Sequence, residues 1–564
     1  MKSDSDMRPL RVGIIVDNAD LHFIAWDLIE RSAKIDAYDV SALIVQQAPP
    51  GVGTSPWAAV RRYLTTGRAS KLFGRLTFEL ITRLEAVIVQ RMKPISCTQD
   101  TKPLDDFDIQ KLAVQPRKSK SGLVFRYSPD DLDAIKTLEL DVLVRAGAGI
   151  LRGEILSVCR YGVLSFHHGD NRVNRGSPAG FWEVYFGAPK TGFIIQRLTE
   201  ELDGGDVLFR GATRTKPLYL MNQSSVFYKS APFFSTFLKK VAETGRLPEV
   251  LESWPYGHPL FSTPTLIVQI GYVARVAGRV FRRFFRRLRR VGQRWAVAYM
   301  RVPDWRNAAL WRAKPIENPE YRYLADPFVW SEDGQDFIFV EDFDVRNGKG
   351  SISAIDITYD SPKHLGLVLD EPFHLSFPFM LKVNGKTHMI PESHQIQEIR
   401  LYQCDIFPQK WSLSEVLISD ISAVDTMVFF KDGLWWLLTN IDSAQMNDYE
   451  SELHIYFSEN ISASSWSPHP GNPVVFDPER ARNGGLLVQP NGDLYRVFQR
   501  QSIDYYGAAM GVARITDLSP TTYSEEVVSI IDPEFFAGAI SGHSLNHEGG
   551  ILAFDYAKIE KMSP

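Results

Sequence analysis

Five segments in the second half of the 564-residue chain share one layout, and this repetition limits the folds that this half can adopt. Each segment has a polar start, a short apolar run, a turn signal and a second run rich in aromatic residues. The segments start at Asp326, Phe377, Asp425, Asn483 and His543. A repeat of roughly fifty residues, with one four-stranded sheet in each unit, is typical of a β-propeller. We therefore predict an all-β five-bladed propeller over residues 318–564, with a β-sandwich of regular hairpins as the alternative.

The first half of the chain has a different pattern, in which short apolar runs alternate with segments of helical spacing. The expected strands cover residues 11–18, 39–47, 140–147 and 161–168, and the expected helices cover residues 21–34 and 216–250. Such strand–helix–strand alternation favours a doubly wound parallel sheet. Residues 1–250 are therefore expected to form an α/β domain, with an insertion within residues 50–125.

A basic segment lies between the two halves, and we assign residues 251–317 to a linker. Nine arginines occupy the twenty positions 275–294, and apolar residues from Val273 to Trp295 recur at three- and four-residue steps. This spacing predicts an amphipathic helix. One interpretation is a linker helix packed between the domains. Another is a helix lying on an anionic membrane surface, since the stripe and the arginines meet both requirements. RNA contact is a third.

Composition excludes several classes of protein. The net charge of −4 gives no general argument for nucleic-acid binding, and none is expected. Three cysteines without a CxxC pair argue against a disulfide scaffold or a thiolate zinc site, and the histidines show no HxH or HExxH group, so no metal is expected. The sequence opens without a signal peptide and has no long apolar span. We expect a cytoplasmic protein, peripheral to the inner face of the membrane if the basic helix binds lipid.

The stretch from Val163 to Leu208 carries several motifs in a fixed order. They are Ser165-Phe166-His167, Arg175-Gly176, Pro178, Thr191-Gly192 and Leu202-Asp203-Gly204-Gly205-Asp206. In this order they resemble the catalytic core of the folate-dependent formyltransferases, which include methionyl-tRNA formyltransferase and the sugar N-formyltransferases. The upstream run over residues 143–156 resembles the strand and loop that precede that core. The resemblance implies a Rossmann-like α/β fold over roughly residues 11–215.

The same resemblance implies the roles of individual residues. His167 moves the proton of the attacking amine, and Asp203 orients His167. The family asparagine that donates to the oxyanion is Ser165 here, whose shorter hydroxyl can still donate. By their place in the upstream loop, Ala146, Gly147, Leu151 and Arg152 are expected to contact the co-substrate, 10-formyltetrahydrofolate.

The propeller carries a second candidate site. The LADPF motif, which contains Asp326, resembles the first-blade signature of furanosidase-type glycoside hydrolases and the N-terminal domain of the plant glucosamine inositolphosphorylceramide transferases. Side chains at the blade starts line the central funnel of such folds. The residues expected there are Asp326, Glu341, Glu392, Asp425 and His543. They would serve glycoside hydrolysis, carbohydrate binding or only the structure; hydrolysis requires two carboxylates that face each other.

These patterns together predict an enzyme. The expected reaction is formyl transfer from 10-formyltetrahydrofolate to the amine of a nucleotide- or lipid-linked amino sugar, in surface-polysaccharide biosynthesis. One alternative is a catalytically silent formyltransferase-like scaffold with a carbohydrate-binding propeller, which Ser165 favours. The other places a glycosidase or glycosyltransferase activity in the propeller.

Overall fold

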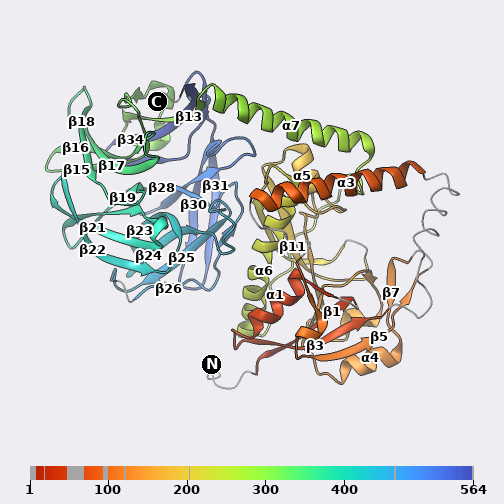
Figure 1. The fold of residues 1–564 in the computed structure, drawn as a ribbon. Coiled ribbons are helices and arrows are strands. Elements are labelled where there is room, and N and C mark those ends of the chain that lie inside the picture. Colours follow the sequence, from red (N-terminus) through yellow and green to blue (C-terminus); the bar gives the residue numbers. More distant parts are fainter. Residues whose placement is uncertain are drawn as a thin grey trace. The chain divides into compact units, whose positions relative to one another are not determined.

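The computed structural model describes residues 8–17, 20–47, 69–92, 100–119, 122–201, 204–462 and 465–561. The chain divides into two compact units, Met1–Ala277 and Gly278–Pro564. The first is an α/β unit and the second consists almost entirely of strands (Figure 1). The division lies within a helix, about 27 residues beyond the expected end of the first domain at residue 250.

The first unit is built on a seven-stranded sheet in the order β12-β11-β10-β8-β1-β3-β5. Its strands are β1 (Leu10–Asp17), β3 (Tyr38–Gln46), β5 (Gln110–Val114), β8 (Val142–Arg145), β10 (Val163–His167), β11 (Lys190–Arg197) and β12 (Asp206–Arg214). Neighbours from β10 to β5 are parallel, and β11 and β12 are antiparallel. The expected parallel sheet is thus confirmed. Strand β5 lies in the segment that the sequence suggested as an insertion, so part of that segment extends the main sheet.

The first unit contains the helices α1 (Phe23–Ser32), α3 (Ala69–Met92), α4 (Pro129–Lys136), α5 (Phe181–Phe186) and α6 (Tyr219–Thr244), and α7 (Leu266–Leu288) begins in it. Helices α1 and α6 pack on one face of the sheet and α4 packs on the other. On β1, Ile14 packs against Leu28 of α1 and Leu238 of α6, and the next residue, Ile15, packs against Ile135 of α4 on the opposite face. Successive side chains of a strand point to opposite faces, so the apolar run of β1 serves both layers.

Short elements complete the first unit and the connections of the second. The short strands of the first unit are β2 (Asp20–His22), β4 (Thr101–Pro103), β6 (Arg117–Lys118), β7 (Val124–Arg126) and β9 (Ile150–Leu151). The 3-10 turns are η1 (Leu104–Asp106), η2 (Glu154–Ser157), η3 (Trp305–Asn307), η4 (Leu310–Arg312), η5 (His394–Ile396) and η6 (Pro533–Phe535).

The second unit contains five sheets in its described residues, which are the five blades of the predicted propeller. The first blade is β15 (Arg322–Glu332), β16 (Gln335–Asp344), β17 (Lys349–Asp356) and β18 (Lys363–Leu369), and the second is β19 (Ser376–Val383), β20 (Lys386–Glu392), β21 (Glu398–Ile406) and β22 (Lys410–Ser419). The third is β23 (Ala423–Lys431), β24 (Leu434–Ile441), β25 (Glu452–Ser458), β26 (Ser467–Pro468) and β27 (Val475–Phe476). The fourth is β28 (Asn483–Val488), β29 (Leu494–Arg500), β30 (Ala509–Leu518) and β31 (Tyr523–Ile531). The fifth is β13 (Val291–Arg301), β14 (Lys314–Pro315), β32 (Ala539–Ser541), β33 (Leu545–Glu548) and β34 (Ile551–Lys561).

The turn signals of the sequence form tight hairpins in the first three blades. Both residues of Asp333-Gly334, Asn384-Gly385 and Asp432-Gly433 have positive φ, as two-residue hairpins of the right twist require. The segment starts are equivalent as well. Asp326, Phe377 and Asp425 have φ of 49°, 45° and 49°, and each lies at an irregularity in the register of its strand pair. The blades therefore repeat residue by residue at their inner ends.

The fifth blade joins distant parts of the chain. Strand β13 pairs with β34 along its whole length, from Val291 with Lys561 to Arg301 with Ile551. This pairing corrects the prediction that residues 251–317 are only a linker, and it corrects the extent of the basic helix. Helix α7 ends at Leu288, and Val291 and Trp295 belong to β13, not to a helical stripe. Trp295 is only 7% exposed, and it packs with Ala325 and Ala557.

Candidate active sites

The order of the parallel strands reverses at β1, whose neighbours β3 and β8 lead toward opposite edges of the sheet. Ligands of open α/β sheets bind outside the carboxyl ends of the strands at such a point. The backbone N–H of Ala148, just after β8, donates to Asp17 at the end of β1 (2.9 Å). A Cβ on Gly147 would lie 2.8 Å from the side-chain nitrogen of Gln46. The predicted residues Ala146 and Gly147 thus lie in a loop held close to the switch point.

His167 is the last residue of β10, at the same edge of the sheet, and its side chain is half-buried. Its Nε2 lies 3.0 Å from the backbone oxygen of Asn174. A carbonyl oxygen only accepts, so in the neutral ring Nε2 carries the hydrogen and Nδ1 keeps the lone pair. Nδ1 is then the atom of His167 that can accept a proton. The neighbouring His168 instead stacks on Phe227 of α6 at 3.7 Å, and burial lowers its pKa to about 3.

Sequence reasoning missed two buried residues that support His167. The side-chain nitrogen of Asn174 donates to a carboxyl oxygen of Glu183 in α5 (3.2 Å), and both residues are buried. Burial raises the pKa of Glu183. The two residues fix the backbone carbonyl that accepts from His167. A sequence signal existed, because Glu183 is the one acidic residue in the otherwise apolar run Phe181–Phe186.

The other predicted residues of this site lie in different surroundings. Ser165 is 1% exposed, and its hydroxyl donates to the backbone oxygen of Phe166 (3.0 Å), so donation to an oxyanion requires the hydroxyl to rotate. Leu151 is 2% exposed and packs in the apolar core. Arg152 has a buried Nε without a hydrogen-bond partner among the described residues, and its guanidinium lies 4.0 Å from Glu200. Asp203 lies outside the described residues.

The five predicted funnel residues of the propeller come together with others that the sequence did not single out. His543 lies between Asp326 (Nε2 to Oδ1, 3.5 Å) and Asp555 of β34 (Nδ1 to Oδ2, 2.6 Å). Asp555 also accepts from the backbone N–H of Asp326 and of His543. All three residues are 5% exposed or less. Asp555 was detectable as a lone acid in the apolar run of Ile551–Ala557.

Arg482 connects the remaining blades at the centre. Its Nε donates to Asp425 (2.7 Å), which also accepts from Gln499, and its guanidinium lies 4.0 Å from Glu392. Glu392, at the end of β20, pairs with His394 at 2.7 Å. Glu341 lies within β16. The backbone N–H of Gly350 donates to Nδ1 of His374, whose Nε2 lies 3.5 Å from Glu341.

Electrostatics divide these carboxyl groups into two kinds. Burial raises the pKa of Asp326, Glu341 and Asp425, and neighbouring carboxylates raise it further. Burial alone would raise the pKa of Glu392 too, but His394 and Arg482 outweigh that effect and lower it. Burial lowers the pKa of His543, yet the carboxylates of Asp555 and Asp326 raise it above its ordinary value. Groups with opposite shifts in one buried cluster are typical of functional sites.

Asp326, His543 and Asp555 also offer three ligand atoms within 4.8 Å of one another. A metal ion would have to displace the close ion pair between His543 and Asp555. The sequence predicted no metal site, and we assign none here.

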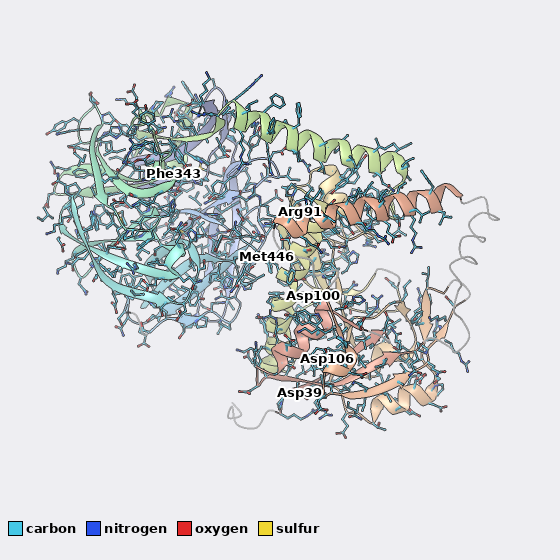
Figure 2. The ribbon with its side chains drawn as sticks, in the orientation of Figure 1. Asp39, Arg91, Asp100, Asp106, Phe343 and Met446 are labelled. Atoms are coloured by element: carbon cyan, nitrogen blue, oxygen red, sulfur yellow. The ribbon has the colours of Figure 1, made fainter. Side chains whose placement is uncertain are left out.

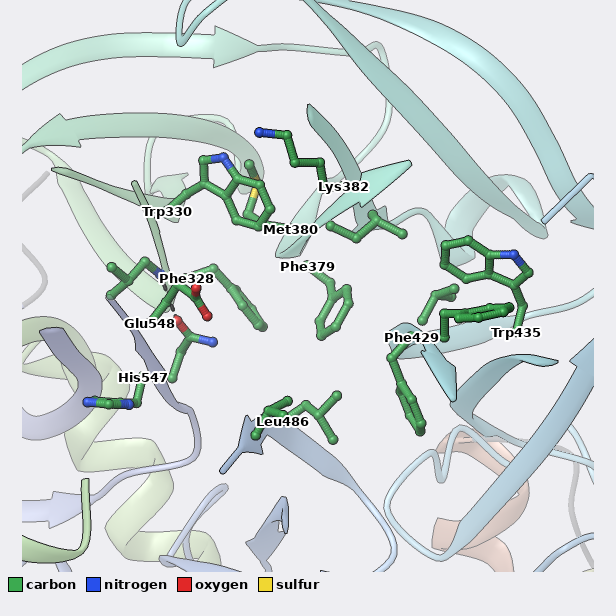
Figure 3. Close-up of a pocket in the computed structure, with 16 residues that line it drawn as sticks. Phe328, Trp330, Phe379, Met380, Lys382, Phe429, Trp435, Leu486, His547 and Glu548 are labelled. Carbon is green, nitrogen blue, oxygen red and sulfur yellow. Dashed lines mark hydrogen bonds between the residues drawn. The ribbon is translucent and has the colours of Figure 1, made fainter. Parts of the chain in front are cut away.

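The inner strands line a separate apolar pocket of about 250 Å³ toward their other ends (Figure 3). Trp330, Phe379, Phe429 and Leu486 supply much of its wall. Glu548 is the one carboxylate among its lining residues, so this pocket lacks the paired carboxylates that glycoside hydrolysis requires.

Comparison with known proteins separates the two units. Residues 313–538 match the family model for the N-terminal part of glucosamine inositolphosphorylceramide transferase 1. The rice (Oryza sativa subsp. japonica) protein of that name is 34% identical over 229 residues, which are 40% of this chain and 30% of the rice protein. Methionyl-tRNA formyltransferase of Francisella tularensis subsp. novicida is 36% identical over 87 residues, 15% of this chain and 28% of that protein. The chain joins a formyltransferase-like unit to a propeller that is similar to the N-terminal part of glucosamine inositolphosphorylceramide transferase 1.

Both sequence relatives are named transferases, and the chain spans less than a third of the length of each. Among solved structures, a xyloglucan-locus GH43B protein of Bacteroides ovatus is 12% identical with a TM-score of 0.30, covering 38% of this chain and 47% of that one. Glycinamide ribonucleotide transformylase 1 of Symbiobacterium toebii is 13% identical with a TM-score of 0.27, covering 42% of this chain and 89% of that one.

None of the helices in the described residues is long and apolar enough to cross a membrane.

Proposed function

We propose that the first unit transfers a formyl group from 10-formyltetrahydrofolate to the amine of an amino sugar. The observation that carries the proposal is the position of His167, a half-buried imidazole at the carboxyl end of β10, on the edge of the sheet where the switch-point loop lies. The likeness to methionyl-tRNA formyltransferase supports the reaction type.

The chemistry needs one proton transfer and one stabilised oxyanion. The amine nitrogen attacks the formyl carbon, the bond from that carbon to the folate nitrogen breaks, and a proton passes from the amine to the departing nitrogen. His167 accepts through Nδ1 and returns the proton to the folate. Asn174 and Glu183 keep the ring in place. The unpartnered Nε of Arg152 fits a contact with the folate, because a buried donor without a partner costs free energy until a ligand satisfies it.

Two observations support a sugar as the acceptor. The propeller matches the N-terminal part of a transferase whose name places it on glucosamine and inositolphosphorylceramide. Its centre combines carboxylates with aromatic rings, since Trp295 stacks on His543 at 4.0 Å and Tyr506 lies over Arg482. Aromatic faces and carboxylates together suit a ring with apolar faces and hydroxyl edges.

The test is incubation of the purified protein with 10-formyltetrahydrofolate and a panel of amino sugars, both nucleotide-linked and lipid-linked. Mass spectrometry of the sugar should show addition of one formyl group, with release of tetrahydrofolate. Absence of donor turnover with every acceptor would contradict the proposal.

A silent first unit is the second candidate, and the hydrogen bond of Ser165 to Phe166 favours it. The two candidates differ in folate affinity, because a scaffold needs no donor pocket. A third candidate places glycosyl chemistry in the propeller. It predicts that Asp326→Asn changes the sugar products while donor turnover in the first unit stays the same.

A further inference from the structure

Helix α3 and the first half of α7, up to Ala277, contact each other in the first unit (Figure 1). The side chain of Gln269 in α7 donates to the backbone oxygen of Gly74 in α3 (2.6 Å). The hydroxyl of Tyr272 donates to Glu85 (2.6 Å), which also accepts from the backbone N–H of Leu220. These contacts fix α3 and the first half of α7 against the unit through polar residues that are all buried.

Phe78 of α3 and Val268 of α7 pack inward on the cluster around Phe181, but both helices also carry a row of apolar side chains on their outer sides. Glu85 and Gln269 are 5% and 1% exposed, whereas Leu84 and Ile267 are 60% and 82% exposed. The exposed apolar residues of this surface are Phe73, Leu76, Leu80, Leu84, Val87 and Ile88 of α3 and Leu266, Ile267, Ile270 and Val273 of α7. An amphipathic helix of a soluble protein normally buries its apolar stripe. A continuous exposed stripe on two adjacent helices marks an interaction surface.

The second half of α7 continues the stripe and adds charge. Val280, Phe281, Phe284 and Leu288 are each at least 60% exposed. Val280 lies seven residues, or two helical turns, after Val273, and Phe284 and Leu288 follow Val280 at steps of four residues. The basic residues of the helix lie on its remaining surface and just beyond its end. They are Arg275, Arg279, Arg282, Arg283, Arg286, Arg287, Arg289 and Arg290. No acidic residue occurs between Glu252 and Asp304 in the sequence, and in the structure Arg282 lies 3.8 Å from Asp504.

We propose that α3 and α7 form a docking surface for an anionic lipid bilayer. The exposed stripes insert at the boundary between headgroups and acyl chains, and the arginines contact anionic headgroups. RNA would use the arginines but would leave the aliphatic stripes in water. A second copy of this chain would bury the stripes but would bring two arginine clusters together. A lipid surface satisfies both features. The inference is independent of formyl transfer.

The first test uses the full chain with vesicles of phosphatidylcholine, with and without phosphatidylglycerol. Sedimentation should show binding only to the vesicles that contain phosphatidylglycerol, and the binding should weaken as salt rises, because salt screens the headgroup charge. Absence of binding at low salt, or equal binding to neutral vesicles, would overturn the proposal.

The arginines are tested by replacing Arg283, Arg287, Arg289 and Arg290 with glutamine. These side chains are exposed, so the fold should be retained, as circular dichroism would verify. Each basic residue near an anionic surface contributes about 1 kcal/mol, which predicts a loss of vesicle affinity of at least about 10²-fold. The matched control replaces Lys239, Lys240, Lys363 and Lys410, which are exposed elsewhere, with glutamine. A similar loss of vesicle affinity in the control would show that net charge alone explains the effect, and it would overturn the proposal.

The stripe is tested by Leu76→Ser, Leu80→Ser and Leu84→Ser together, on the exposed side of α3. Vesicle affinity should fall at least tenfold, since apolar area no longer leaves water. A control with Leu123→Ser, Ile406→Ser and Leu413→Ser removes three exposed apolar residues elsewhere and should bind normally. Unchanged vesicle binding of the α3 variant would overturn the proposal. Two other results would do the same: a dimer of the unaltered chain that this variant dissociates, or binding of RNA without binding of vesicles.

Discussion

At the residue scale, one backbone contact determines which nitrogen of His167 can take a proton. Because Asn174 accepts from Nε2, Nδ1 is the basic atom. We expect His167→Ala to lower formyl transfer by at least about 10², the lower scale of general acid–base catalysis. Donor affinity should change little. The control His364→Ala removes an exposed histidine of the propeller and should leave the rate unchanged. A variant of His167 with the full rate would remove this residue from the mechanism.

Asn174 and Glu183 act on the reaction only through His167. Glu183→Gln keeps the volume and an acceptor for the side chain of Asn174. We expect a fall of several-fold in kcat, with KM nearly constant, because the ring is held less firmly when it must move a proton. The pH–rate profile is the decisive measurement. A purely structural role would lower the melting temperature without moving the profile.

Asp425 shows how a buried carboxyl group connects pH to stability. Burial raises its pKa to about 7, above its value in the unfolded chain, so the folded propeller keeps a proton that the unfolded chain has lost. The contribution of Asp425 to the free energy of unfolding therefore falls as pH rises from about 4 to about 7. Asn tolerates the positive φ of this position. In urea unfolding, the unaltered protein should lose stability relative to Asp425→Asn across this range, and a difference that is constant with pH would contradict the raised pKa.

At the scale of elements, the fifth blade depends on β13. Trp295, Val297 and Tyr299 are buried in it, and each large apolar side chain contributes about 1.5–3 kcal/mol on burial. Their loss would remove about 5 kcal/mol or more, as much as the whole stability of a marginal domain. A chain that starts at residue 318 lacks β13 and should therefore fail to melt cooperatively. A chain that starts at residue 289 keeps β13 and should melt in one cooperative transition. Equal melting temperatures would show that β13 is dispensable.

At the scale of the whole molecule, the two units should respond to different ligands. A ligand at 100 times its Kd stabilises the unit that binds it by about 2.7 kcal/mol. In calorimetry, a folate analogue should raise only the melting temperature of the first unit, which is the transition that a chain starting at residue 289 lacks. An amino sugar that binds the propeller should raise only the melting temperature of the second unit. A folate analogue that shifts the propeller transition would place the donor site in the wrong unit.

The sequence by itself determined most of the elements of both units. The apolar runs at β1, β3, β8 and β10 are buried strands, and the DG and NG pairs are tight hairpins, because both depend on neighbours within a few residues. The fifty-residue repeat likewise gave the number of blades. The formyltransferase motifs placed His167 at a strand end. The role of Asp203 beside His167 stays a prediction, because Asp203 lies outside the described residues.

Tertiary structure alone decided which distant residues meet and which face of a helix is covered. Arg482 reaches Asp425, and Asp555 reaches His543, through side chains from different blades or strands, and no periodicity records such contacts. The periodic stripe from Val273 to Trp295 belongs partly to α7 and partly to β13, since pairing with β34 outweighs helical spacing after Leu288. Figure 2 labels Arg91, in the last turn of α3. The outward stripe of that helix is visible only once Glu85 is known to face inward, because amphipathic spacing gives two faces and packing selects the buried one.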